Sequence, residues 1–285
     1  MIDYSVLMSV YAGADPVHLR QALQSMMDQT LRTNDFVLVC DGPLTSELDE
    51  VLASFDKAYP GIFNFIRVEK NIGIGPVANL GLSHCRNELI AKMDSDDIAV
   101  RERCEKQIAR FNECPDIAVL GGHIAEFESD PTKPFSVRVV PCDHKTILRF
   151  GRRRQPFNNM TVMYRRSVVL AVGGYKDYRR CEDYNLFMRI LHEGYYAENL
   201  NEILVYARVN GDAIGRRGSW ETLVGCVRSR WESFRIGYST LLDLGICIIG
   251  ELVIFISPRG LKRKLYETFL RKKSVPDGGS EINVG

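Results

Sequence analysis

The chain has 285 residues, of which 45% are hydrophobic and 26% charged, and its formal net charge is +1. This is the composition of an ordinary soluble globular protein, and it excludes disordered and collagen-like chains. The charge is unevenly spread, because residues 1–200 hold 24 Lys and Arg against 27 Asp and Glu, whereas residues 201–285 hold 13 against 9. A slightly acidic body is therefore followed by a basic C-terminal region.

The first 114 residues alternate between strand and helix patterns. Short β-rich apolar runs occupy residues 4–10, 36–40, 63–68 and 89–93, and helical patterns follow them at 19–27, 45–59, 76–85 and 101–114. This alternation predicts an α/β fold with a doubly wound, mostly parallel sheet, which binds ligands at the carboxyl ends of its strands. Polar residues at those ends are the candidates for a functional site.

The remaining chain predicts a more mixed structure. We expect a strand around Gly121 and Gly122, helices at 144–150 and 182–193, and a strand at 203–209, followed by helical segments after Gly218. The domain boundaries are then 1–215 for a catalytic domain, 216–273 for a basic and apolar helical region, and 274–285 for a Gly/Ser-rich flexible tail. Eight cysteines without a C-x-x-C pair, and an N-terminus without a signal peptide, indicate reduced thiols in a cytosolic protein.

The fourth predicted strand ends in a turn with three carboxylates, Asp94, Asp96 and Asp97. Their mutual repulsion raises at least one pKa unless a divalent cation neutralises them, and Mg²⁺ or Mn²⁺ with diphosphate oxygens suits an all-oxygen site. The alternative is a solvated Asp-rich turn that caps the helix starting near Arg101.

Three further features lie at predicted element ends. Asp41 follows the second strand, where a carboxylate can accept hydrogen bonds from a nucleobase or ribose, and residues 71–76 after the third strand contain glycines that allow a ligand close to the backbone. That loop has the alternative explanation of a turn that needs a positive φ. Glu182 and Asp183 open a helix, where helix capping is the alternative to a catalytic role.

Taken in order, these motifs resemble family 2 glycosyltransferases of the GT-A type over about residues 4–215. The resemblance rests on residues 4–11, Asp41-Gly42, Asn71-x-Gly73 with Asn79, residues 93–97, Gly173-Gly174-Tyr175 and Glu182-Asp183-Tyr184. Within the family, the chain is most similar to small bacterial enzymes of the amylovoran-type subgroup. These enzymes extend lipid-linked O-antigen, capsule or exopolysaccharide repeat units.

The resemblance implies a role for each matching position. Asp183 would be the catalytic base, with Glu182 and Asp97 positioning and polarising the site, and Asp96, Asp94 and Asn210 would hold Mn²⁺ or Mg²⁺. Asn210 stands where many relatives have histidine, and it would be a weaker ligand. The donor nucleotide-sugar would contact the following residues: Ser9, Val10, Tyr11, Asp41, Asn71, Gly73, Asn79, Asp94, Arg216 and Arg217.

The C-terminal region predicts peripheral attachment to an anionic membrane. Residues 206–273 hold 13 Lys and Arg against 6 Asp and Glu, and arginines alternate with aromatic residues between Trp220 and Tyr238. The apolar run 241–256 is too short and too charged for a confident transmembrane span. A solvated helix packed on the core is the alternative, and nucleic-acid binding is disfavoured because the basic residues adjoin an apolar stretch.

We therefore predict an inverting, metal-dependent glycosyltransferase that acts at the cytoplasmic face of the bacterial inner membrane. It would move a sugar, with galactose as the best guess, from a UDP-sugar to a lipid-diphosphate-linked saccharide. Two alternatives are a sugar-1-phosphate nucleotidyltransferase and a non-catalytic membrane-associated assembly protein. The first would need a Gly-rich loop with a basic residue where this chain has residues 11–15, and the second would tolerate loss of Asp96 and Asp183.

Overall fold

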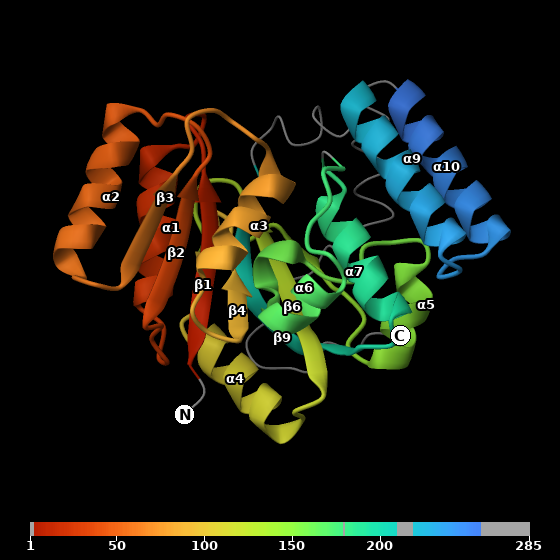
Figure 1. Ribbon diagram of the computed structural model, residues 1–285, viewed down its shortest axis with the longest axis horizontal. Helices are drawn as coiled ribbons and strands as arrows, with labels where there is room; N and C mark the ends of the chain where they lie inside the picture. The colour runs from red at the N-terminus through yellow and green to blue at the C-terminus, as the bar shows by residue number, and fades with distance from the viewer. Residues whose placement is uncertain (1–2, 179, 210–218, 258–285) are drawn as a thin grey trace.

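The first half of the chain forms a parallel sheet in a computed structural model that describes residues 3–178, 180–209 and 219–257. Its strands lie in the order β3-β2-β1-β4, as expected for a doubly wound sheet (Figure 1). The elements are β1 Tyr4–Val10, α1 Pro16–Met27, β2 Asp35–Cys40, α2 Ser46–Ala58, β3 Phe63–Arg67, α3 Ile74–His84 and β4 Leu89–Lys92.

Helices cover both faces of this half of the sheet. Val6 and Met8 of β1 pack in one core cluster with α1 and α2, whereas Leu7 packs in a second cluster with α3. Side chains alternate between the two faces of a strand, so a strand buried on both faces is apolar at nearly every position. The continuous apolar runs in the sequence therefore correspond to central parallel strands.

The second half of the sheet is mixed, as predicted. Strand β8 pairs antiparallel with both β4 and β6, β6 pairs parallel with β9, and the short β5 lies antiparallel to β9. The elements are β5 Ile98–Ala99, α4 Arg103–Glu113, β6 Ile117–Phe127, β7 Ser136–Arg138, α5 His144–Gly151, the 3-10 turn η1 Asn159–Thr161, β8 Met163–Arg165, α6 Arg166–Ala171, α7 Glu182–His192 and β9 Tyr196–Arg208. Strand β9 begins at Tyr196, earlier than predicted.

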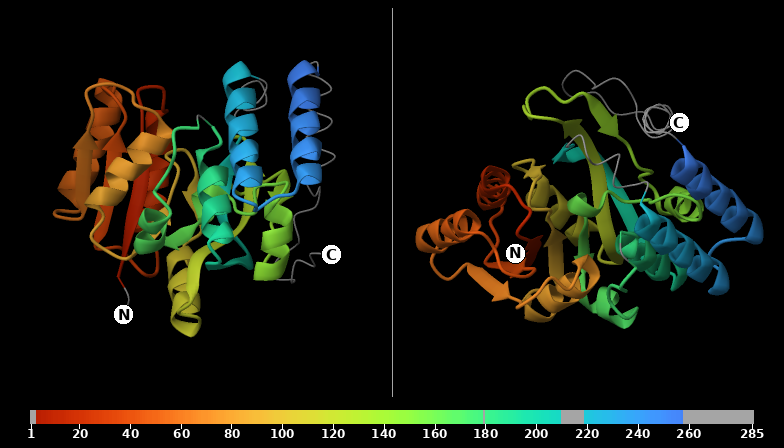
Figure 2. Two further views of the ribbon diagram at one scale, coloured as in Figure 1. Left: turned by 45° about the vertical axis from the view of Figure 1, so that its right-hand side comes forward. Right: turned by 90° about the horizontal axis from the view of Figure 1, so that it is seen from above.

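Two C-terminal helices, α9 Trp220–Arg235 and α10 Leu241–Ile256, lie side by side at one flank of the molecule (Figures 1 and 2). Helix α9 packs against α7, where the Arg230 guanidinium lies 3.8 Å from the ring centroid of Tyr184. Within the described ranges, no helix is long and apolar enough to cross a membrane.

The cysteines differ from the prediction at one pair. Cys181, just before α7, forms a disulfide with Cys226 on α9, and their Cα atoms are 5.5 Å apart. The prediction of reduced thiols was wrong for this pair, because 45 residues separate the two cysteines and only the packing of α9 on α7 brings them together. The other six cysteines are free thiols.

Candidate active site

The carboxyl ends of β1, β2 and β4 bring several predicted residues to one edge of the sheet. Val10 at the end of β1 is buried and accepts a hydrogen bond from the backbone N–H of Asp41, 2.7 Å away. Tyr11, just beyond it, is half exposed. Asn210, Arg216 and Arg217 lie outside the described residues.

Asp41 anchors the loop that precedes α3. Its carboxylate is buried, and the two oxygens accept hydrogen bonds from the backbone N–H groups of Ile72 (2.7 Å) and Gly73 (3.2 Å). The side chain of Asn71 donates to the carbonyl oxygen of Asp41 at 3.4 Å. Gly73 has φ 91°, a conformation that favours glycine. Asp41 therefore shapes the loop that the resemblance assigns to the donor, and its own contact with uridine stays a prediction.

Asn79 links α3 to the Gly-Gly-Tyr segment. Its Oδ1 accepts from the backbone N–H of Tyr175 and its Nδ2 donates to the carbonyl oxygen of Tyr175, each over 2.7 Å. A Cβ atom on Gly174, which has φ 66°, would lie 2.5 Å from Asn79 Oδ1. Glycine at this position therefore permits the link. The contact gives Asn79 a positioning role, while its predicted contact with the donor is untested.

The Asp-rich turn follows β4 and is organised by two basic residues. Asp94 is partly exposed, and its Oδ1 lies 3.7 Å from the Nζ of the buried Lys92. Asp97 is buried and accepts a hydrogen bond of 2.8 Å from the backbone N–H of Arg208 at the end of β9. The Arg208 side chain donates to the carbonyl oxygen of Asp96 at 3.1 Å. Burial raises the pKa of Asp97 well above its ordinary value, and the charges of Asp96 and Asp94 add to this rise, as the sequence predicted.

Glu182 and Asp183 occupy the first turn of α7. Glu182 is 7% exposed, and its Oε2 has no hydrogen-bond partner. Burial raises the pKa of Glu182 to about 7, with a further contribution from the charge of Asp183 and an opposing one from Lys92. Burial also raises the pKa of Asp183, although its carboxylate accepts a hydrogen bond of 2.7 Å from the backbone N–H of Tyr184.

The end of β4 and the start of α7 form one electrostatic cluster. The negative charge of Asp94 contributes to the raised pKa of Asp183, and the positive charge of Lys92 lowers the pKa of Glu182. Carboxyl groups with pKa values raised toward pH 7 are typical of acid–base catalysis when they lie at a sheet edge where ligands bind. The structure therefore brings together the predicted base and the predicted metal-binding turn.

The donor atoms of the turn fit a divalent cation held jointly with a substrate. No three His, Cys, Asp or Glu side chains among the described residues form a ready metal site. Asp94 and Asp96 are the partly exposed carboxylates of the turn. Mg²⁺ is commonly bound by one or two carboxylates together with substrate phosphates. Asp94 and Asp96 would supply the protein ligands, and a diphosphate would complete the shell.

Sequence reasoning missed three residues that organise this site. Lys92 and Arg208 hold the Asp-rich turn, and Glu232 of α9 accepts a hydrogen bond of 2.7 Å from Asn185 of α7. A lysine inside an otherwise apolar strand was the available signal for Lys92, because buried lysines are rare unless they are paired. Arg208 and Glu232 carried no such signal.

The comparisons with known sequences agree with this geometry. Residues 5–179 match the family described as Glycosyl transferase family 2, and the chain belongs to this family. It is 35% identical to the amylovoran biosynthesis glycosyltransferase AmsE of Erwinia amylovora, over 76% of this chain and 80% of that protein. It is 30% identical to the UDP-Gal:alpha-D-GlcNAc-diphosphoundecaprenol beta-1,3-galactosyltransferase of Escherichia coli, over 94% of this chain and 97% of that protein.

The fold also matches a solved glycosyltransferase structure. The mannosyltransferase PcManGT of Pyrobaculum calidifontis, in complex with GDP-Man and Mn²⁺, aligns with a TM-score of 0.64 and 13% identity. The alignment covers 96% of this chain and 76% of that one. The α/β architecture with a mixed sheet is thus that of a glycosyltransferase. The chain is a glycosyltransferase of the bacterial polysaccharide type, as the sequence predicted.

Proposed function

We propose that this glycosyltransferase transfers galactose from UDP-galactose to a saccharide linked through diphosphate to a lipid, in the synthesis of a bacterial surface polysaccharide. The E. coli relative supports donor and acceptor together, because its name gives both and the two chains align over nearly their full lengths. The observation that carries the proposal is the cluster of Asp183, Glu182 and Asp94 at the ligand-binding edge of the sheet.

In the proposed reaction, Asp183 acts as the base. Its carboxylate takes the proton from an acceptor hydroxyl as that oxygen bonds to the anomeric carbon of the donor sugar. The bond from that carbon to the diphosphate breaks on the opposite face, so the anomeric configuration inverts and UDP leaves with the electron pair. A raised pKa suits Asp183 to this role, because a base works best when its pKa is near the operating pH.

The other residues of the site set the charge around this step. Glu182 lies next to the base, and its pKa is raised to about 7. Its protonation state therefore changes the charge that Asp183 experiences. Lys92 supplies a buried positive charge beside Asp94. A divalent cation, when bound by Asp94 and Asp96, would stabilise the charge that develops on the departing diphosphate. Mn²⁺ in the PcManGT complex supports this proposal.

A panel of UDP-sugars tests the donor. Purified protein with Mn²⁺ should be protected against thermal unfolding by UDP-galactose, and should slowly hydrolyse it, more than UDP-glucose, UDP-N-acetylglucosamine or UDP-N-acetylgalactosamine. Preference for another UDP-sugar would overturn the galactose assignment alone. Failure of every UDP-sugar to protect the protein or to be hydrolysed would overturn the UDP-sugar donor.

We further propose that α10 attaches the enzyme to the cytoplasmic face of the inner membrane, where such an acceptor lies. Leu241, Leu242, Ile249 and Ile256 of α10 are each more than 60% exposed. This apolar surface is followed in the sequence by the basic clusters 262–264 and 271–273, which lie outside the described residues. Exposed apolar side chains next to basic residues suit an anionic lipid surface.

Flotation with liposomes tests the attachment. The full-length chain should bind vesicles of phosphatidylethanolamine and phosphatidylglycerol, and binding should weaken but persist at high salt, since salt screens charge but not apolar burial. Ile249→Asp should reduce binding, whereas Val17→Asp, at a similarly exposed apolar position of α1, should not. Absence of binding at low salt would overturn the membrane attachment and would indicate that α10 belongs to a packed C-terminal subdomain.

A further inference from the structure

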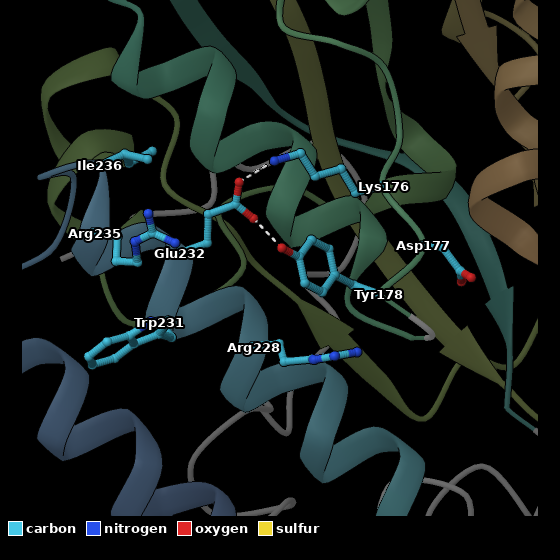
Figure 3. Close-up of a pocket in the computed structure, with 8 residues that line it drawn as sticks. All are labelled: Lys176, Asp177, Tyr178, Arg228, Trp231, Glu232, Arg235 and Ile236. Carbon is cyan, nitrogen blue, oxygen red and sulfur yellow. Dashed lines mark hydrogen bonds and ion pairs between the residues drawn. The ribbon is translucent and has the colours of Figure 1, made fainter.

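An open cleft of about 640 Å³ lies between α9 and the segment that follows the Gly-Gly-Tyr motif (Figure 3). A cleft of this size falls within the range of small-ligand sites. Its lining is rich in basic and aromatic side chains from two elements: Lys176, Asp177, Tyr178, Arg228, Trp231, Glu232, Arg235 and Ile236.

One face of α9 supplies most of the charge in this cleft. Arg228, Glu232 and Arg235 are spaced four and three residues apart, so they share one side of the helix. Glu232 is already neutralised, because Lys176 pairs with it and Tyr178 and Asn185 donate hydrogen bonds to it. Burial raises its pKa, but these three partners outweigh burial and leave the pKa below its ordinary value.

The two arginines, by contrast, have no partner among the described residues. Neither Arg228 nor Arg235 makes a hydrogen bond or an ion pair there, and both are exposed to the cleft. Even with the carboxylate of Asp177 counted, the lining has a net positive charge. Guanidinium groups bind phosphate oxygens with two parallel hydrogen bonds, so two unpaired arginines at one cleft favour a phosphate-bearing ligand.

The cleft lies beside the first turn of α7, which carries the proposed base. Asn185, which donates to Glu232, is three residues after Glu182 and shares its side of the helix, and Glu182 is the neighbour of Asp183. The predicted donor residues lie on β1, on α3 and in the loops after β2, β3 and β4. These strands and α3 are on the other side of α7 from α9 (Figure 1). A ligand that reaches Asp183 from this cleft therefore approaches from the side opposite the donor, which is the side of an acceptor.

We propose that this cleft binds the diphosphate of the lipid-linked acceptor, with Arg228 and Arg235 as its phosphate ligands. Trp231 is half exposed and projects away from Arg228 in Figure 3, and it contacts the first carbons of the lipid chain. The saccharide then extends from the diphosphate toward Asp183. This inference rests on the proposed function, since it requires an acceptor that carries a diphosphate.

Three acceptor probes test the inference. In each, N-acetylglucosamine is attached to the same short alkyl chain, and the link between them is a diphosphate, a monophosphate or a bond without phosphate. Arg228→Ala/Arg235→Ala should raise KM for the diphosphate probe by about 10- to 100-fold, the value of one or two charge-assisted hydrogen bonds. The phosphate-free probe and the KM for UDP-galactose should change less than about twofold. Arg32→Ala/Arg149→Ala is the matched control, because it removes two other exposed arginines that have no hydrogen bond or ion pair with the described part of the chain.

Several results would overturn the inference. One is an unchanged KM for the diphosphate probe, and another is an equal loss with all three probes, which would indicate damage to the fold. Weaker flotation with anionic liposomes at unchanged KM would assign the arginines to phospholipid headgroups. If no probe is a substrate of the wild type, calorimetry with the alkyl diphosphate, with UDP and Mn²⁺ present, tests diphosphate binding in the cleft separately from the proposed transferase activity. Binding lost in the double variant keeps the cleft as a diphosphate site, and equal binding or none overturns it.

Discussion

The buried carboxyl of Glu182 should make the free energy of unfolding depend on pH. Burial, with help from the charge of Asp183, raises its pKa from 4.5 to about 7 in the native state. Between these values the native protein keeps a proton that the unfolded chain has released, so the contribution of Glu182 to stability is highest below pH 4.5 and falls as pH rises toward 7. At 1.36 kcal/mol for each pKa unit, the loss is on the order of 3 kcal/mol.

Glu182→Gln isolates this effect, because glutamine keeps the shape of the protonated side chain and cannot ionise. Urea unfolding, followed by circular dichroism in EDTA without nucleotide, measures the free energy of unfolding from pH 4.5 to 8.5. The variant and the wild type should have similar stability at the acidic end, and the variant should be more stable by about 2 to 3 kcal/mol at pH 8. Glu193→Gln, at the exposed C-terminal end of the same helix, should track the wild type throughout.

A constant difference between Glu182→Gln and the wild type across this pH range would refute the reasoning. It would mean that Glu182 titrates as it does in the unfolded chain, and that its burial carries no electrostatic cost. The charge of Asp183 contributes to the raised pKa of Glu182, so the difference between the two proteins includes the interaction within this pair.

Three further sets of experiments test the remaining parts of the site. EDTA should abolish transfer, and Mn²⁺ or Mg²⁺ should restore it. Asp96→Ala should stay inactive with either ion. Full activity in EDTA would show that transfer needs no metal. Gly173→Ala should cost about 1 to 2 kcal/mol of stability for its positive φ. Gly174→Ala should cost at least about 1 kcal/mol more, because the new Cβ displaces Asn79; equal costs would contradict this. Lys92→Met should move the acidic limb of the kcat/KM pH profile to higher pH, because loss of the positive charge raises the pKa of the neighbouring carboxyl groups. An acidic limb at the same pH would show that Lys92 acts only in packing.

The fold was predictable where one local pattern decided each element. The parallel half was read from apolar runs that alternate with helical patterns, because strands buried on both faces leave a strong signal. Strand β8 has three residues, too few for a periodic pattern. The start of β9 was hidden because polar residues such as Glu198 and Asn199 interrupt its apolar pattern, and its register against β6 shifts near Gly122 and His123.

The site was predictable where its residues lie at the ends of elements. Asp94 and Asp96 follow from the rule that ligands bind at strand ends. The role of Asp183 was implied by the resemblance to family 2 glycosyltransferases, because an acidic first turn of α7 is also explained by helix capping. Arg208 contacts Asp97 across 111 residues, and such a contact depends on the packing of β9 beside β5. Tertiary partners of this kind leave no local pattern in a single sequence.

Sugar transfer by Asp183→Asn tests the central claim most directly. Transfer is measured from radiolabelled UDP-galactose to N-acetylglucosamine linked through diphosphate to an alkyl chain. Asparagine keeps an oxygen that can accept from the Tyr184 N–H but cannot take the acceptor proton. We expect kcat to fall by about 10²- to 10⁴-fold with KM for UDP-galactose little changed, while Asp56→Asn, at an exposed acidic residue of α2, keeps kcat within about twofold of the wild type. A near-normal kcat in folded Asp183→Asn would show that this carboxylate only caps the helix, and would contradict its role as the base.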